Sequence, residues 1–294
     1  MVEEDFIGAA LSRSVQVVHL YREAVSFKIA PVHMSDSALP SPEAVRAFYD
    51  RTYQAQGLAD PAYLYRWIVQ LLHPTPGRTI LDVACGEGHL LSYAHQAQLV
   101  PSGIDISSEA ITRATVRCPE ATLSVGNGEA LPFPDGAFDF VTSLGSLEHY
   151  RDMDAGLKEM ARVLKPDGVA CIMVPNVFWL GDVLEVLWRG GCSSSFQVIE
   201  RHGTRQGWRH LLEAHGVVVQ QTLRYNKPYP LFAGSSWKLK SLRKFLWRRL
   251  FNALCPFNLS LEFIYLCRKR PVCSSRFEVE SIRIRAPVES LGDH

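Results

Sequence analysis

The fold is decided by the stretch Ile80-Leu81-Asp82-Val83-Ala84-Cys85-Gly86-Glu87-Gly88, in which an apolar strand runs directly into a glycine-rich turn. Glycines at such a turn allow positive φ and let a ligand approach main-chain N–H groups. Dinucleotide-binding folds place G-x-G-x-x-G here, but Leu91 stands where the third glycine would be, so the match to NAD-binding proteins is poor. Asp82 supplies a carboxylate that could pair with the ammonium group of a ligand.

Strand and helix patterns alternate after this turn. Strands are expected over 79–84, 99–106, 121–125, 138–143, 169–174, 217–225 and 261–267, and helices over 88–96, 153–164, 179–188 and 204–215, with another capped at Ser107 or Ser108. Two helices, from residue 42 and over 61–72, precede them, and residues 166–168 are expected to form a turn. This alternation indicates βαβ crossovers and a doubly wound parallel sheet, whose strands should be continuous apolar runs buried on both faces.

Polar residues follow the next three strands. Asp105 and Ile106 end the second strand, where a carboxylate can accept from both hydroxyls of a ribose. Residues 127–129, Asn-Gly-Glu, follow the third strand, where a polar side chain could reach an adenine edge. The fourth strand leads through Ser143 and Leu144 to residues 147–150, Leu-Glu-His-Tyr.

In order and spacing, these four elements resemble the class I S-adenosylmethionine-dependent methyltransferases, particularly the branch similar to ubiquinone and menaquinone C-methyltransferases. The resemblance covers residues 48–176. It implies a Rossmann-like α/β fold, with a seven-stranded, mostly parallel sheet whose last strand is antiparallel. The ligand would lie over the carboxyl ends of the strands, and N-terminal helices with helical insertions would form a cap.

The resemblance also implies S-adenosylmethionine as the cofactor and no metal. Residues 84–88 would hold the methionine portion, and the expected cofactor contacts are Asp82, Ala84, Cys85, Gly86, Gly88, Asp105, Ile106, Asn127, Gly128, Glu129, Ser143 and Leu144. The family usually has Asp where Asn127 stands, and Asn accepts a hydrogen bond without charge assistance. Local roles remain open: Asp82 and Asn127 as turn residues, and Asp105 as a helix N-cap.

The acceptor side is less determined. His149 is the candidate general base, because histidine titrates near neutrality. The alternative is a structural role, since the sequence Leu-Glu-His is common in the family as a structural feature. Tyr49 and Tyr53 are expected on the substrate side or in a helix packed on the sheet, and His202 on the substrate side or in a solvated loop. Cys85 is interpreted as a small residue beside the cofactor, not as a nucleophile, since no basic partner is adjacent in the sequence.

Composition limits the partners and the compartment. The formal net charge of +1 gives no overall field for nucleic acid, which is not expected as a partner. None of the seven cysteines forms a C-x-x-C pair, which favours a reducing compartment. The sequence starts with acidic residues and lacks the apolar stretch of a secretory signal, and it shows no pattern typical of a membrane span. These features predict a cytoplasmic protein. The basic segment Trp237 to Phe251 alternates Lys and Arg with apolar residues, so it could lie at a membrane surface or pack on the domain.

The expected function is methyl transfer to a small-molecule acceptor, an apolar one such as a quinone or lipid-like compound. An RNA or protein acceptor is the alternative, although residues 143–147, Ser-Leu-Gly-Ser-Leu, replace the Asn/Asp-Pro-Pro-aromatic motif of amino-group nucleic-acid methyltransferases. A non-catalytic cofactor-binding protein is a third interpretation, since fold does not establish function. The expected organisation is an N-terminal extension over 1–40, disordered or helical, a methyltransferase domain over 41–270 and a tail over 271–294. Within the domain, the core is expected at 78–175 and the substrate-side insertions at 176–207 and 226–258.

Overall fold

The structure is a computed structural model that describes residues 39–191, 197–226, 250 and 254–270. Apart from residues 39, 40 and 250, the expected N-terminal extension, the basic segment Trp237 to Phe251 and the tail over 271–294 lie outside these described residues. Within the described ranges, every helix falls short of the length and apolar character that a bilayer crossing requires.

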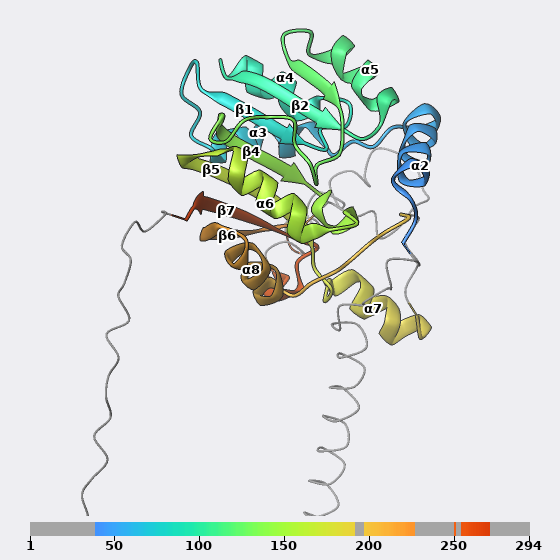
Figure 1. Cartoon of the computed structure of the whole chain (residues 1–294). Coiled ribbons are helices and arrows are strands. Elements are labelled where there is room, and N and C mark those ends of the chain that lie inside the picture. The colour runs from blue at the N-terminus through green and yellow to red at the C-terminus, as the bar shows by residue number, and fades with distance from the viewer. Residues whose placement is uncertain (1–38, 192–196, 227–249, 251–253, 271–294) are drawn as a thin grey trace, which may run out of the picture.

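A seven-stranded sheet forms the centre of the molecule, with the strand order β3-β2-β1-β4-β5-β7-β6 (Figure 1). Strand β7 runs antiparallel to both of its neighbours, and the other pairs are parallel. The chain builds outward from β1 to β3 and then returns to β4, so the order reverses between β1 and β4, where α/β sheets bind ligands. The strands are β1 Thr79–Val83, β2 Val100–Asp105, β3 Thr122–Val125, β4 Phe138–Leu144, β5 Leu164–Pro175, β6 Val217–Tyr225 and β7 Glu262–Lys269.

Helices cover both faces of this sheet (Figure 1). They are α2 Pro42–Ala55, α3 Ala62–Leu71, α4 His89–Gln96, α5 Ser108–Arg117, α6 Met153–Val163, α7 Leu180–Arg189 and α8 Arg205–Ala214, with short 3-10 turns η2 Leu147–His149 and η3 Phe257–Leu259. Because side chains alternate along a strand, β1 sends Leu81 into the core beneath α6 and α8, and Ile80 into the core beneath α3 and α4. This arrangement confirms the expected doubly wound α/β fold.

The helix starts follow the sequence signals closely. Ser41 caps α2 through its side chain, and Pro42 occupies the first helical position, where its missing N–H costs nothing. Of the two cap candidates for α5, Ser107 is the one that accepts the hydrogen bond, from the N–H of Ala110. The elements that shape the site therefore begin where their sequences predict.

Two expectations about strands are wrong. Residues 166–168 do not form a separate turn before the fifth strand, because β5 already begins at Leu164, which pairs with Phe138 before a register shift in the ladder. The shift accommodates the extra residues as a bulge. Strand β3 is not buried on both faces either: it is the edge strand, and Thr122 and Val125 are exposed.

Candidate functional site

A cavity of about 490 Å³ lies at the carboxyl ends of β1, β2 and β4. We call its two sides the core half and the cap half. The core half consists of the lining residues at the ends of β1 and β2 and in the segments after β1, β2 and β3, namely Asp82, Ala84, Cys85, Gly86, Asp105, Ile106, Gly126, Asn127, Gly128 and Glu129. The cap half consists of the lining residues from α2, from the last residues of β4 and β5 and from the segments after these strands, namely Val45, Tyr49, Tyr53, Leu144, Ser146, Glu148, His149, Pro175, Gln197 and Glu200.

The glycine-rich turn has the backbone shape that its sequence predicts. Gly86 and Gly88 have φ of 53° and 74°, and Ala84 also lies in the left-handed region at 59°, where a residue with a Cβ is strained. A Cβ on Gly88 would lie 3.2 Å from the Cα of Ala114 in α5, so a side chain there would crowd α5 in addition to straining the left-handed backbone. Helix α4 begins directly after this turn, so its unpaired N–H groups and the positive end of its dipole lie there.

Asp105 ties the ends of β1 and β2 together. Its two carboxylate oxygens accept hydrogen bonds from the N–H groups of Gly86 and Ser107, each at 2.8 Å. Each oxygen can accept a second bond, which a pair of ligand hydroxyls could supply. Burial raises the pKa of Asp105 to about 6. Because Ser107 caps α5, Asp105 is not that helix's N-cap residue.

Asp82 is a second buried carboxylate in the core half. Its Oδ1 accepts a 2.6 Å hydrogen bond from the hydroxyl of Thr142 on β4, so this contact joins two strands and caps no turn. Burial raises the pKa of Asp82 to about 7, and the negative charge of Asp105 adds to the shift. A cation bound between these carboxylates would stabilise their ionised forms.

Residues 127–129 of the core half are held by local turns. The side-chain oxygen of Asn127 accepts from the N–H of Glu129 at 3.0 Å, so Asn127 is a turn residue that also lines the cavity. The carboxylate of Glu129 in turn accepts from the N–H of Arg151 at 2.8 Å. A ligand amine would have to share the Asn127 oxygen with this turn.

His149 in the cap half is held in one tautomer. Its Nδ1 lies 2.6 Å from the carbonyl oxygen of Ile199, so Nδ1–H donates and Nε2 keeps a lone pair. Nε2 lies 3.8 Å from a carboxylate oxygen of Glu148. Burial lowers the pKa of His149, so the ring is neutral at pH 7 and can accept a proton.

The two tyrosines of α2 both reach the cavity. Tyr49 donates from its hydroxyl to the side-chain oxygen of Gln197 at 3.1 Å, and Tyr53 places its hydroxyl over Gly86. Burial raises the pKa of both phenols, so they remain protonated hydrogen-bond donors at neutral pH. Burial likewise raises the pKa of the Cys85 thiol, which is not activated as a nucleophile.

Three expected site residues do not line the cavity. Gly88 packs on α5, and the hydroxyl of Ser143 is buried 2.7 Å from that of Ser146. His202 is 40% exposed and pairs with Glu200 at 3.3 Å. All the other expected site residues line the cavity.

Sequence reasoning missed several lining residues. Gln197 and Glu200 belong to the segment that contains His202, and Asp60, Tyr65 and Glu262 come from other loops and elements. The segment around residue 200 could be located as an insertion, but it has no regular periodicity that would show which side chains turn inward. Met173 and Pro175, at the end of β5, could have been found from the rule that ligands lie at strand ends.

Comparison with known proteins places the core of this chain among methyltransferases. Residues 81–172 match a methyltransferase domain family. A Mycolicibacterium smegmatis protein described as an S-adenosylmethionine-dependent methyltransferase is 32% identical over 145 residues, covering 48% of this chain and 55% of the relative. The 2-methyl-6-phytyl-1,4-hydroquinone methyltransferase of Synechocystis is 34% identical over 161 residues, covering 50% and 48%. The chain spans about half the length of the curated relatives it matches.

A solved structure shares the fold over most of this chain. It is the Haloferax volcanii methyltransferase in complex with the Trm112 methyltransferase activator, which matches with a TM-score of 0.56 and 18% identity, covering 77% of this chain and 98% of that one. At this identity the likeness concerns the fold alone. Residues 81–172 therefore match a methyltransferase domain, and about half of the chain is similar to proteins described as S-adenosylmethionine-dependent and quinone-related methyltransferases, among them a ubiquinone/menaquinone biosynthesis C-methyltransferase of Shewanella frigidimarina that is 32% identical over 139 residues.

Proposed function

We propose that this protein transfers a methyl group from S-adenosylmethionine to a small-molecule acceptor within the cavity. The observation that carries the proposal is the core half: a turn with three positive φ values, whose Gly86 N–H binds a buried carboxylate at the end of the next strand. Backbone N–H groups, a carboxylate for a ribose diol and a second carboxylate for an ammonium group are the features that an adenosyl amino acid requires.

The residues present fit this cofactor. Asp105 would accept from the ribose hydroxyls, and Asp82 would face the positive charge of the methionine portion. The raised pKa values of these two carboxyls support the assignment, because a buried carboxylate pair is costly to ionise until a cation arrives. The cofactor supplies an electrophilic methyl group on a sulfonium. Residues Ala84 and Gly86 would hold the methionine portion against the turn, and residues 127–129 would flank the adenine.

His149 would act on the acceptor. Methyl transfer needs the acceptor held in line and shielded from water, and an acceptor hydroxyl or acidic carbon must also lose a proton. The Nε2 lone pair of His149 would take that proton, while Nδ1–H stays bonded to Ile199. Tyr49 and Gln197, which also line the cap half, would help to position the acceptor.

The charges in the cavity limit the acceptor. Among the described lining residues the carboxyl groups are Asp60, Asp82, Asp105, Glu129, Glu148, Glu200 and Glu262, whereas Arg151 is the only arginine or lysine. A carboxylate or phosphate on the acceptor would therefore be repelled. We propose a neutral acceptor of quinone-like or lipid-like character, in line with the hydroquinone named for the Synechocystis relative. Its contacts would come from residues 41–72 and 176–207, whereas most of the third expected insertion, 226–258, lies outside the described residues.

Calorimetry and product labelling test this proposal. The purified protein should release heat on titration with S-adenosylhomocysteine and none with NAD. Incubation with methyl-labelled S-adenosylmethionine and cell extract should place the label in an organic-soluble, low-mass product. Binding of NAD in place of S-adenosylhomocysteine would contradict the proposed function. Label in RNA or protein would overturn the acceptor class alone, and cofactor binding without any labelled product would indicate a non-catalytic role.

A further inference from the structure

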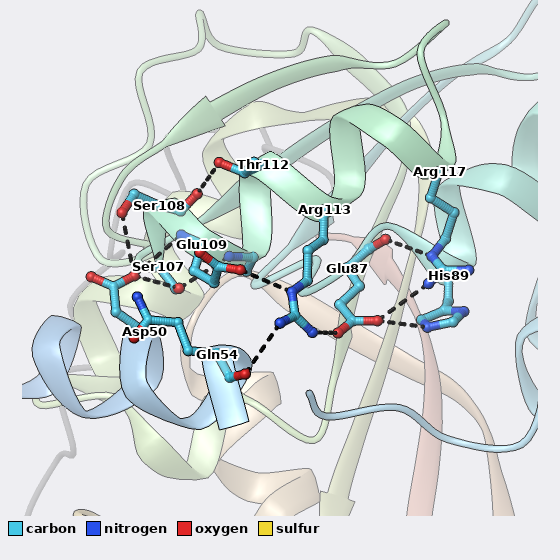
Figure 2. A network of polar contacts seen from close by, with 11 residues as sticks. Asp50, Gln54, Glu87, His89, Ser107, Ser108, Glu109, Thr112, Arg113 and Arg117 are labelled. Atoms are coloured by element: carbon cyan, nitrogen blue, oxygen red, sulfur yellow. Dashed lines mark hydrogen bonds and ion pairs between the residues drawn. The ribbon is translucent and has the colours of Figure 1, made fainter. Parts of the chain in front are cut away.

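Helix α2 uses two neighbouring faces for two purposes. Val45, Tyr49 and Tyr53 recur every four residues and line the cavity. The carboxylate of Asp50 faces α5 instead, and the main-chain carbonyl group of Gln54 also contacts α5, as Figure 2 shows. The wall of the cavity that α2 provides is therefore held in place from its adjacent face.

Asp50 makes the tightest of these contacts. One of its carboxylate oxygens accepts from the hydroxyl of Ser107 at 2.6 Å, from the N–H of Glu109 at 3.3 Å and from the hydroxyl of Ser108 at 3.4 Å. These donors surround the N-terminus of α5, where a carboxylate is favoured by the unpaired N–H groups and by the helix dipole. Asp50 thus binds α2 to the start of α5.

Ser107 links this contact to the cofactor side of the cavity. While its hydroxyl donates to Asp50, its N–H donates to Asp105 at 2.8 Å. The other oxygen of Asp105 accepts from Gly86, and Tyr53 of α2 lies over Gly86. The contacts therefore form a closed ring that leaves α2 at Asp50 and returns to it at Tyr53. A displacement of α2 would disturb Asp105 from both ends.

A second, more exposed set of contacts joins the same elements. Arg113 of α5 donates to Glu87 in the glycine-rich turn at 2.9 Å, to Glu109 at 3.0 Å and to the carbonyl oxygen of Gln54 at 3.5 Å (Figure 2). The Arg113 side chain is 35% exposed, and ion pairs with that exposure contribute little. The contact between Asp50 and the buried Ser107 is therefore the one whose loss should matter most.

We propose that Asp50 is a positioning residue that fastens α2 over the site, and that a ligand bound at Asp105 tightens α2 through Ser107. The tightening of α2 by a ligand rests on the proposed function, because it requires S-adenosylmethionine or its product at Asp105. The fastening of α2 by Asp50 does not, since the contacts of Asp50 exist without a ligand. In this way occupancy of the core half would set the position of Tyr49 in the cap half before the acceptor binds.

Hydrogen exchange measured by mass spectrometry, with and without S-adenosylhomocysteine, tests the proposal on three variants. Asp50→Ala removes the contacts. Asp50→Asn keeps a side-chain oxygen that accepts from the same donors, and Arg51→Ala is the matched control on the exposed face of the same helix. In Asp50→Ala we expect residues 42–56 to exchange about tenfold faster than in the natural protein, with residues 138–144 of β4 unchanged. Asp50→Asn and Arg51→Ala should stay within about twofold of the natural protein.

The same variants separate coupling from simple packing. Asp50→Ala should bind S-adenosylhomocysteine about fivefold more weakly and lose the ligand-induced protection of residues 42–56, whereas Asp50→Asn should keep both. Equal exchange in Asp50→Ala and Arg51→Ala would overturn the fastening of α2. Faster exchange throughout the sheet would also overturn it, because the effect would then be global. If the natural protein does not bind S-adenosylhomocysteine, the proposed function fails while the exchange comparison without ligand still decides the role of Asp50.

Discussion

The two halves of the cavity are built in different ways. In the core half, strand register places the important groups: Asp82 lies opposite Gly103, and Asp105 lies opposite Val125. The hydrogen bonds there come largely from main-chain N–H groups. In the cap half, side chains from distant segments meet. Tyr49 bonds to Gln197, which lies 148 residues away in the sequence, and His149 bonds to the carbonyl group of Ile199, which lies 50 residues away.

This difference indicates how one fold can serve many acceptors. The core half cannot change without altering the sheet itself, because its N–H groups and carboxylates belong to the strand ends. Most cap-half side chains belong to α2 and to the segments after β4 and β5, so they can change while the sheet keeps its register. We therefore expect substitutions in the core half to abolish cofactor binding, and substitutions in the cap half to alter catalysis and acceptor affinity.

Asp105→Ala should have the largest effect. It leaves the N–H groups of Gly86 and Ser107 without their buried acceptor and removes the proposed ribose contact. Losses of this kind amount to about 1–3 kcal/mol each, so affinity for S-adenosylhomocysteine should fall by several hundredfold, measured by calorimetry. Asp139→Ala is the control, because Asp139 is also a buried aspartate with main-chain contacts but lies outside the cavity lining. It should lower the melting temperature and leave affinity unchanged; equal loss of affinity in both variants would contradict the assignment.

His149→Gln should affect catalysis without affecting cofactor binding. Glutamine can still donate to Ile199 but cannot accept a proton at neutral pH, so kcat should fall by about a hundredfold. Affinity for S-adenosylhomocysteine should stay within about threefold. His202→Gln is the matched control, since His202 lies outside the cavity lining and should leave kcat unchanged. The kcat of both variants is measured as the rate of label transfer from S-adenosylmethionine to the acceptor recovered from extract. An unchanged kcat in His149→Gln would limit His149 to a structural role.

The same division explains what the sequence could predict. The glycine-rich turn and Asp105 were predicted because the ends of parallel strands converge, and strand ends are visible as the last residues of apolar runs. Asn127 lines the cavity, yet its oxygen is used in its own turn, a detail of side-chain rotation that no periodicity records. In the cap half, His202 was singled out, whereas Gln197 and Glu200 are the residues of that segment that line the cavity. The path of an irregular segment depends on tertiary packing, so neighbouring residues cannot be ranked from the sequence.

Cofactor binding should weaken as the pH falls. Burial raises the pKa of Asp82 to about 7 and that of Asp105 to about 6 in the unliganded protein, and the proposed ligand favours the ionised forms. Below pH 7 these carboxyls must lose protons before binding, so affinity for S-adenosylhomocysteine should fall by about tenfold or more between pH 8 and pH 6. Calorimetry in buffers of different ionisation enthalpy counts the protons released.

Stability of the unliganded protein should show the opposite pH trend. Both carboxyls keep their protons in the folded chain at pH values where the unfolded chain has lost them, so their contribution to stability is lost as the pH rises through 6 and 7. Asp82→Asn should flatten both pH profiles, because the amide does not titrate. A profile that stays steep in Asp82→Asn would assign the effect to another group.

Tyr49→Phe should have the smallest effect and defines the boundary between the halves. It removes only the hydroxyl that donates to Gln197 at 3.1 Å, and a hydrogen bond of this kind contributes about 1 kcal/mol. We expect KM for the acceptor to rise about threefold to fivefold, with affinity for S-adenosylhomocysteine unchanged. Tyr63→Phe is the matched control, because it removes a hydroxyl bonded to Tyr225 at the same distance of 3.1 Å but outside the cavity lining. If Tyr49→Phe weakened cofactor binding as strongly as it weakened acceptor binding, Tyr49 would belong to both sites, and the cap half could not vary independently of the core half.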